Sequence, residues 1–401
     1  MTNTPTNTNN QINETELIIG DETFAAAYGE SLTATLDIDL WQTGGDLEGL
    51  YERLELEVES AVATENAMRD DIRRKVFPNL RNRSVASAHT GCYRVTRSDL
   101  QHIHRKLLFN GAVEACDGTS VEHDTLPVTI TQIGVCLVSY QGDQGSWAQR
   151  LYRRDLRAST GNALDDLMAL LENRAQRGNT DNDERGRLSE LARRGIMTYA
   201  ERAILTRKSQ APWRVGHGNP TPYELLTGSG SMSLLVRSLE VMRELVLNHR
   251  KILFVPSAPR DRLLLTLGQA LYPLEFLVVE HLERRMMSVV DNGHYGREYR
   301  ALAEAFCKEV GPKLVVGVYR ASAAAPPYVF FAHADFACEA AMIAIADSVL
   351  QEHRGFPMLI DLADTICRTT FGNDIFNSAV QMAYAHAGEP FRFLNERMTR
   401  A

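Results

Sequence analysis

The segment from Ala112 to Tyr140 constrains the fold of this chain more than any other. It opens with an apolar run that leads into Asp117-Gly118, and two β-rich segments follow, Val128–Ile133 and Val135–Tyr140. A carboxylate fixed at the end of a buried strand, with a glycine that lets the backbone pass close to a phosphate or a metal ion, is typical of a binding site for either. Asp-Gly is also among the commonest hairpin turns, so a plain turn is the alternative interpretation.

The composition is that of a globular protein. The chain has 401 residues, of which 44% are hydrophobic and 23% charged. Its length suits roughly two to three domain-sized units, or one large domain with insertions. The net charge of −8 does not favour a protein that coats nucleic acid along its whole surface, but it leaves room for a local basic channel.

The cysteines and the hydropathy pattern indicate the cellular compartment of the protein. No two of the six cysteines stand at CxxC spacing. We therefore expect the cysteines to be small core residues in a reducing compartment and not the ligands of a zinc site. The polar N-terminus does not have the plan of a signal peptide. No apolar run reaches the ~18 residues that span a bilayer. The sequence therefore predicts a cytoplasmic protein without a membrane segment.

The pattern along the chain predicts a disordered tail, a helical arm and one large mixed domain. We expect residues 1–20 to be disordered, residues 21–104 to form the arm around a long helix from Asp46 to Val76, and residues 105–401 to form the domain, with helical insertions. The long helix suits either a partner contact or a helix that only covers the core.

Short apolar runs and longer periodic segments alternate in the second half of the chain. Buried strands are expected at residues 251–256, 313–319 and 328–331, and a short strand with a Gly/Ser turn at Tyr223–Met232. Helices are expected at residues 163–175, 188–205, 234–247, 263–271, 299–310, 337–351, 358–367 and 375–387. This order predicts an α/β fold, a mixed sheet with helices on both faces and a helical C-terminal part.

Acidic residues at separate places could build a metal-dependent phosphodiesterase site. They are Asp117, Glu201 in the helical segment GIMTYAERAIL, and Asp361 and Asp364 at i and i+3 in RGFPMLIDLADTIC. Two-metal hydrolysis needs carboxylates from different elements around two cations, and Mg²⁺ and Mn²⁺ prefer hard oxygen ligands. We therefore predict that Asp117, Glu201, Asp361 and Asp364 bind metal.

Each of these patterns also has a structural explanation. Asp361 and Asp364 could be solvated residues that favour a helix dipole, and Glu201 could lie on an exposed helix face. The TGSGSM segment could be a helix N-cap, and without the lysine of a P-loop it predicts no nucleotide cofactor. His217 is assigned no role, because it lies in a segment that looks like a polar loop.

Two basic clusters could line a DNA path or could be solvated faces. One runs from Arg150 to Arg157 and the other comprises Arg202, Arg207 and Lys208. Trp147 and Tyr152, interleaved with the first cluster, favour nucleic acid.

The order of these motifs resembles that of the NurA nuclease family. The stretches that carry the resemblance lie between residues 105 and 400 and are EACDGTS, TYAERAIL, YELLTGSGS, GVYRASAAA and RGFPMLIDLADTIC. The resemblance implies an RNase H-like fold and a homodimer. It also implies a Mn²⁺-dependent (or Mg²⁺-dependent) DNA nuclease that docks on a HerA-type hexameric ATPase and serves in DNA-end processing, DNA repair or phage defence. By the same resemblance Asp117, Glu201 and Asp364 are the catalytic residues.

The sequence departs from the family pattern at three positions. The family's aspartate falls on Thr227, its tyrosine on Phe356 and its histidine on Asp364. The last exchange keeps a good ligand for Mg²⁺ or Mn²⁺, but threonine is neutral and a weak ligand. Either another acid substitutes, with Glu224, Asp335 and Asp361 as candidates, or the site is impaired.

Two functions follow from this, an active nuclease or a catalytically impaired dimeric adaptor of a HerA-type motor. A metabolic hydrolase or nucleotide-binding enzyme is disfavoured, because the chain has neither a GxSxG elbow nor a dinucleotide glycine fingerprint.

Overall fold

A computed structural model describes residues 20–41, 47–124, 128–141, 146–155, 168, 194–259, 261–293, 295 and 297–393. The chain divides into two compact units, residues 1–67 and residues 68–401. The predicted disordered tail lies outside the described residues except for Gly20, and so does the helix predicted at residues 163–175, apart from residue 168. None of the described helices has both the length and the hydrophobicity of a membrane-spanning helix.

The first unit is helical and contains α1 (Asp21–Tyr28), α2 (Leu32–Leu36) and most of α3 (Leu47–Asp71). Helix α2 begins at Ser31, whose hydroxyl accepts a hydrogen bond from the Ala34 amide at 3.1 Å. The long helix predicted from Asp46 to Val76 is confirmed: α3 continues through a π-helical turn that ends at Val76.

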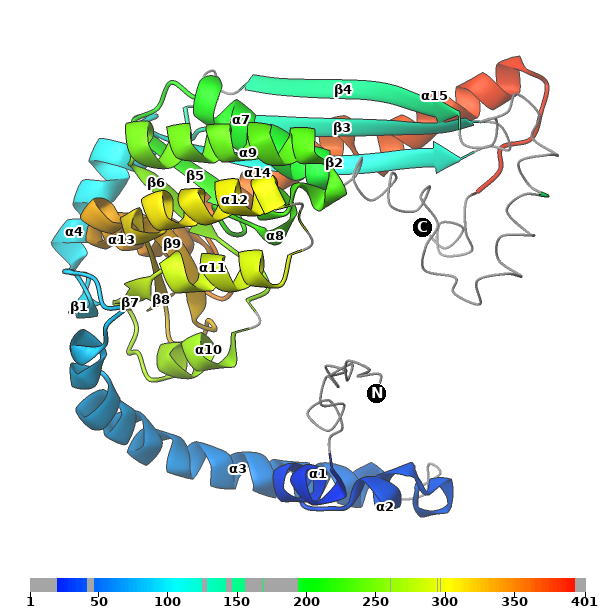
Figure 1. The fold of residues 1–401 in the computed structure, drawn as a ribbon. Coiled ribbons are helices and arrows are strands. Elements are labelled where there is room, and N and C mark those ends of the chain that lie inside the picture. The colour runs from blue at the N-terminus through cyan, green and yellow to red at the C-terminus, as the bar shows by residue number, and fades with distance from the viewer. Residues whose placement is uncertain are drawn as a thin grey trace, which may run out of the picture. The chain divides into compact units, whose positions relative to one another are not determined.

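A nine-stranded mixed sheet forms the centre of the second unit (Figure 1). Its strand order is β1-β7-β8-β9-β6-β5-β2-β3-β4. Strands β2, β5 and β6 run parallel to one another, and every other neighbouring pair is antiparallel. The strands are β1 (Gly91–Arg94), β2 (Val113–Asp124), β3 (Val128–Val138), β4 (Ser146–Asp155), β5 (Trp213–His217), β6 (Ile252–Val255), β7 (Glu275–His281), β8 (Leu314–Arg320) and β9 (Tyr328–His333).

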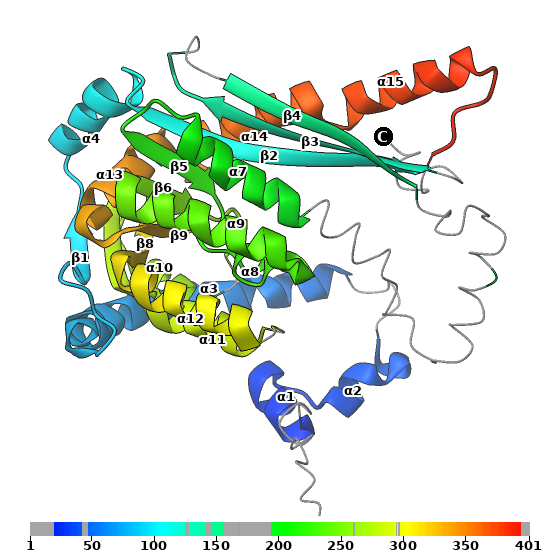
Figure 2. The same cartoon turned by 45° about the horizontal axis from the view of Figure 1, so that its top comes forward.

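Helices cover both faces of this sheet (Figure 2). One face packs against α7 (Ile196–Arg207), α8 (Tyr223–Leu226), α9 (Met232–Arg243), α10 (Arg262–Gln269), α11 (Glu283–Asp291) and α12 (Arg297–Val310). The other packs against α4 (Arg97–Ile103), α13 (Ala337–Ser348) and α14 (Met358–Phe371), and α15 (Asn373–His386) follows α14. The predicted mixed sheet with helices on both faces is therefore confirmed.

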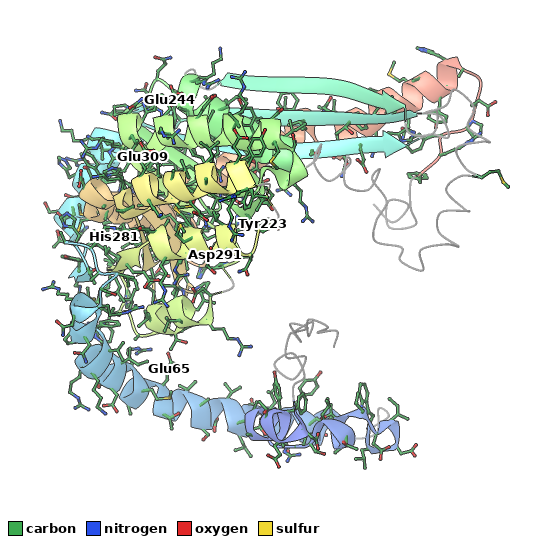
Figure 3. The ribbon with its side chains drawn as sticks, in the orientation of Figure 1. Glu65, Tyr223, Glu244, His281, Asp291 and Glu309 are labelled. Carbon is green, nitrogen blue, oxygen red and sulfur yellow. The ribbon has the colours of Figure 1, made fainter. Side chains whose placement is uncertain are left out.

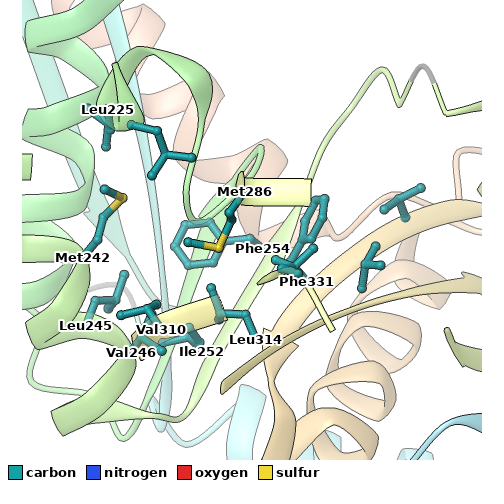
Figure 4. Close-up of a cluster of buried hydrophobic side chains, with 14 of the residues drawn as sticks. Leu225, Met242, Leu245, Val246, Ile252, Phe254, Met286, Val310, Leu314 and Phe331 are labelled. Carbon is teal, nitrogen blue, oxygen red and sulfur yellow. The ribbon is translucent and has the colours of Figure 1, made fainter. Parts of the chain in front are cut away.

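Two hydrophobic clusters, one on each face, hold the second unit together. Side chains alternate along a strand, so Ile252 and Phe254 of β6 enter the first cluster while Leu253 and Val255 enter the second. Figure 4 shows Phe254 and Ile252 packed among Met242 of α9 and other residues of the first cluster. Strand β6 is consequently apolar on both sides, as a strand buried between two helical layers must be.

The segment from Ala112 to Tyr140 differs from its prediction in a way that matters for function. Asp117-Gly118 is neither a strand end nor a hairpin turn, because β2 continues through both residues to Asp124 while pairing with β3. The two β-rich segments predicted after it form one strand, β3. Asp117 therefore projects from the interior of a long strand, where its backbone is held by pairing to β3.

Other differences come from short apolar runs. Residues 223–232 were expected to form a strand with a turn, but Tyr223, labelled in Figure 3, begins the helix α8, and a 3₁₀ turn follows at Gly228–Gly230. Strands β1, β4, β5 and β7 and helix α11 were not predicted. Residues 100–108, expected to be a mixed segment, belong to α4 and to a π-helical turn that ends at Leu108.

Candidate active site

A cavity of about 470 Å³ lies beyond the last paired residues of the parallel strands β2 and β5, and residues from the first turns of α14 also line it. Its polar lining consists largely of ionisable groups from four separate stretches of the chain. Among them are Asp117, Glu201, His217, Arg354, Asp361 and Asp364. The four residues that the sequence predicted as metal ligands thus surround one space.

Two parallel strands place Asp117 beside His217. Cys116 of β2 lies opposite Gly216 of β5 at the last pair of their ladder, so the next residue of each strand stands at the same edge. Asp117 is buried, with 6% of its surface exposed. Its Oδ1 atom lies 3.6 Å from Nδ1 of His217 and accepts a hydrogen bond from the Gly118 amide at 2.9 Å.

The neighbours of the His217 ring fix its orientation. The amide of Ser257 donates to Nε2 at 3.3 Å and the Ser257 hydroxyl lies 2.9 Å from the same atom, which leaves the Nδ1 proton directed at Asp117. Phe356 packs against the ring edge-on, with 6.2 Å between the two ring centroids. The neighbouring carboxylate of Asp117 raises the pKa of His217 above its usual value, against the effect of burial.

Glu201 reaches the cavity from the opposite face of the sheet. It lies on α7 and is 7% exposed. A side chain at position 118 would collide with it, because a Cβ there would stand 2.7 Å from the Glu201 Oε1 atom. Gly118 thus leaves the space that Glu201 occupies in its close approach to β2. Burial, opposed by Arg202 and reinforced by the charge of Asp117, raises the pKa of Glu201 to about 7.

Arg202 is a buried cation at the back of this site. Its Nη1 atom donates to Glu201 Oε2 at 2.9 Å, and Nη2 donates to the carbonyl oxygens of His217 at 3.0 Å and Asn219 at 2.7 Å. The guanidinium also lies 4.6 Å from the ring centroid of Phe254. Arg202 therefore joins α7 to the end of β5 and holds one oxygen of Glu201.

Helix α14 supplies two carboxylates at the mouth of the cavity. Asp361 accepts a hydrogen bond from Arg354 at 2.6 Å, and Asp364 pairs with Arg368 at 3.0 Å. Both carboxylates are partly exposed. Burial and the nearby charge of Asp117 raise the pKa of Asp364.

A buried carboxylate on α13 fixes the start of α14. Asp347 accepts a hydrogen bond from the Leu359 amide at 2.9 Å and another from the Tyr140 hydroxyl. It thereby satisfies one of the free amides in the first turn of α14. Burial raises the pKa of Asp347 from 3.8 to about 6, although both hydrogen bonds oppose the shift.

Asp347 is expected to make stability depend on pH. Because its folded-state pKa is raised, the associated stabilisation is complete below pH 4 and is lost as the pH rises through about 6, a loss on the order of 3 kcal/mol in total. Asp347→Asn should therefore gain about 2 kcal/mol relative to the wild type between pH 4.5 and pH 7.5. Urea unfolding at both pH values measures this.

The exposed residue Asp374, in the first turn of α15, serves as the control. Asp374→Asn should stay within about 0.5 kcal/mol of the wild type, as expected for a substitution at an exposed position. A constant difference between wild type and Asp347→Asn across this range would contradict the interpretation.

The other residues discussed as ligands do not line the cavity. Thr227 lies after α8, where its hydroxyl donates to the Tyr223 carbonyl at 2.8 Å. Asp335 pairs with Arg250, and Glu224 is on α8. Of the three acids considered as substitutes, only Asp361 borders the cavity. His217, which had been assigned no role, stands at the end of the strand parallel to β2.

The chemistry of these side chains suits a hard divalent cation. Carboxylates and imidazole are ligands of Mn²⁺ and Mg²⁺, and the charge of Asp117 raises the pKa values of both Glu201 and Asp364, a repulsion that a cation would relieve. Within the described residues, no three His, Cys, Asp or Glu side chains converge closely enough to form a ready-made metal site. These side chains are of the kinds that bind a divalent cation, but in the described residues they are not close enough together to bind one as they stand.

Three comparisons with known proteins gave the following results. A scan against protein-family models gives no match, and neither does a search of curated proteins. Among solved structures, the NurA nuclease from Sulfolobus solfataricus matches with a TM-score of 0.42 and 9% identity, over 85% of this chain and 98% of that one. A structure of NurA with manganese matches with a TM-score of 0.41 and 8% identity, over 82% and 98%. A structure of NurA bound to dAMP and manganese has a TM-score of 0.36 and 8% identity, over 80% and 92%.

These structures belong to the family that the sequence motifs resemble. With identities below 10% and TM-scores below 0.5, they are distant from this chain. The function proposed below therefore rests on the residues of the cavity.

Proposed function

We propose that the chain is a DNA nuclease that depends on Mn²⁺ or Mg²⁺. In this proposal residues 105–401 supply the catalytic residues of the nuclease, and the arm is the part of residues 21–104 that precedes the second unit, up to residue 67. The protein acts in the cytoplasm as a homodimer, with a HerA-type ATPase that delivers DNA for end processing, repair or phage defence. The observation that supports the activity is the convergence of Asp117, Glu201, His217 and Asp364 on one cavity, together with the order of motifs along the sequence.

Each residue has a role that its surroundings support. Asp117, Glu201 and Asp364 would hold the cation, and His217 would hold a proton at Nδ1 toward Asp117. A cation bound there would supply charge neutralisation at the phosphate and would lower the pKa of a water molecule. Arg354 borders the cavity, and its side chain is 57% exposed; it would pair with a phosphate oxygen of the substrate. Tyr328 also borders the cavity and offers the phenol that Phe356 lacks.

Metal removal tests this proposal. End-labelled single-stranded and linear duplex DNA should be cleaved by the purified chain with Mn²⁺ or Mg²⁺, and addition of EDTA should abolish cleavage because the carboxylates alone repel the phosphate. Product length on a denaturing gel is the measurement. Cleavage that persists unchanged in EDTA would rule out the metal dependence.

One observation favours a second function, that of a catalytically impaired adaptor for a HerA-type motor. Arg202 already neutralises Glu201 within the site, as a metal ion would in an active enzyme. Under this alternative, calorimetric titration with Mn²⁺ gives no stoichiometric binding and no DNA is cut, although the ATPase is bound. Stoichiometric Mn²⁺ binding that is lost in Asp117→Asn would exclude it.

A further inference from the structure

Four acidic side chains of the described residues border the cavity, and the proposed function uses three of them. Asp117, Glu201 and Asp364 would hold the cation, which leaves Asp361 without a role. The carboxylate of Asp361 is already engaged, because its Oδ2 atom accepts a hydrogen bond of 2.6 Å from Nη1 of Arg354. Arg354 borders the same cavity. The function of Asp361 therefore follows from what Arg354 does.

The backbone on both sides of this ion pair is held in place. Gly355 follows Arg354 in the left-handed region, with φ of +61°, and its carbonyl oxygen accepts a hydrogen bond from the Tyr319 hydroxyl at 3.2 Å. Asp361 lies in the first turn of α14, where its amide donates to the Pro357 carbonyl at 3.3 Å. The side chains of Arg354 and Asp361 are 57% and 27% exposed. The pair therefore opens and closes by rotation of two side chains on a fixed backbone.

Arg354 retains hydrogen-bond donors for a second anion. Its Nη1 atom donates to Asp361 and to Oε1 of Gln351 at 3.1 Å, whereas Nε and Nη2 make no hydrogen bond within the part of the chain that the structure describes. A guanidinium group presents its N–H donors in a fork that fits two oxygens of one phosphate. The carboxylate of Asp361 neutralises this cation and repels a phosphate that approaches it. Asp361 and DNA therefore compete for Arg354.

The second carboxylate of α14 is placed differently. Burial and the charge of Asp117 raise the pKa of Asp364, so Asp364 is within electrostatic reach of Asp117. Its own partner is Arg368, and among the described residues it is Arg354 and not Arg368 that lines the cavity. Of the two carboxylates, Asp364 is thus the one suited to the cation and Asp361 the one suited to the arginine.

We propose that Asp361 is a positioning residue and not a metal ligand. Its carboxylate holds Arg354 beside the cavity and competes with phosphate for it. This inference rests on the proposed function and names the group that sets how tightly the site holds a phosphate. A DNA strand contacts the protein at several phosphates and displaces the carboxylate, whereas a single phosphate, such as the end of a cleaved product, is released.

A double-mutant cycle on DNA binding tests the competition. The probe is a fluorescein-labelled single-stranded oligonucleotide, and its Kd is measured by anisotropy in EDTA at physiological salt. Asp361→Asn should bind it about tenfold more tightly than the wild type, because Arg354 is no longer neutralised. In an Arg354→Gln protein the same substitution should strengthen binding by about twofold or less, which is the effect of one negative charge without the competition.

Two further variants control for charge and for structure. Glu240→Gln removes one negative charge from an exposed pair with Arg237 on α9, away from the cavity, and should leave the Kd within about twofold of the wild type. Asp361→Glu keeps the carboxylate and should bind the oligonucleotide within about threefold of the wild type. The inference is overturned if Asp361→Asn gains equally with and without Arg354, or if none of the variants binds the oligonucleotide.

Calorimetric titration with Mn²⁺ decides between a positioning residue and a metal ligand. Asp361→Asn should keep the Mn²⁺ affinity of the wild type to within about fivefold, whereas Asp364→Asn should lose at least about thirtyfold. A loss in Asp361→Asn as large as that in Asp364→Asn would make Asp361 a ligand and overturn the inference.

Cleavage assays on the same samples separate this inference from the proposed function. Mn²⁺-dependent cleavage by the wild type, together with equal gains in both backgrounds, would leave the nuclease standing and remove the role of Asp361. A larger gain in the presence of Arg354, with no Mn²⁺ binding and no cleavage, would do the reverse.

Discussion

Asp117→Asn is expected to lower the rate of DNA cleavage by a factor of about a thousand or more. The substitution keeps the shape of a side chain that is 6% exposed and removes the charge around which Glu201, His217 and Asp364 are arranged. Residues that act as a unit lose most of the catalysis when one of them is removed. The initial rate of cleavage of end-labelled DNA with Mn²⁺ is the measurement, and DNA binding, followed by fluorescence anisotropy, should be retained.

Glu122→Gln is the matched control for this substitution, because Glu122 lies five positions further along the same strand and does not line the cavity. Its cleavage rate should stay within about twofold of the wild type, as expected for a change outside the site. A residual rate in Asp117→Asn equal to that of Glu122→Gln would remove Asp117 from the mechanism and, with it, the proposed activity.

Arg202→Met is expected to destabilise the fold by about 3 to 5 kcal/mol. The change leaves the carboxylate of Glu201 buried without its cation, which is the costly way to break a buried ion pair. It also removes the donors that satisfy the carbonyl oxygens of His217 and Asn219. The free energy of unfolding in guanidinium chloride at pH 8 measures the loss.

Arg207→Met tests whether the loss is specific. Arg207 lies on the same helix, where its half-exposed side chain pairs with Glu244 at 3.6 Å, and exposed pairs contribute about 0 to 1 kcal/mol. The double variant Glu201→Gln, Arg202→Met should recover part of the stability that Arg202→Met loses, because no buried charge remains. An Arg202→Met protein as stable as Arg207→Met would show that Arg202 does not hold α7 to the end of β5.

The sequence was informative where chemistry and local pattern coincide. Asp117, Glu201, Asp361 and Asp364 were selected because acidic residues at strand and helix positions could provide metal ligands, and the structure places all four around one cavity. Their roles remain predictions until the variants are measured. Phe356, noted as a departure, also borders this cavity and packs against His217.

The surroundings of His217 and Thr227 could not be predicted from the sequence. The strand β5 is only five residues long, and without the knowledge that it pairs with β2 the histidine at its end looks like part of a polar loop. The available signal was the alternation of Trp213 and Val215 with Arg214 and Gly216, which ends one residue before His217. The segment around Thr227 is as short and as apolar, but it is helical, and periodicity cannot separate the two cases over so few residues.

The long helices were predictable because their period repeats over several turns, as in α3, α12 and α15. The pairing between strands that are distant in the sequence was not predictable. Asp117-Gly118 has the composition of a turn, and it remains extended only because β3 pairs with β2 on both sides of it. Tertiary pairing thus overrides local preference at the residue that matters most for the proposed chemistry.

The position of β1 at the outer edge of the sheet has a consequence for synthesis. Gly91 pairs with Val278, a partner that the ribosome adds 187 residues later. At the usual pace of translation this interval is about 10 to 40 s, during which the segment that becomes β1 has been made without its neighbour. Fragments that stop before β7 leave this strand permanently unmatched, so truncated products of this chain should be prone to aggregation and to proteolysis.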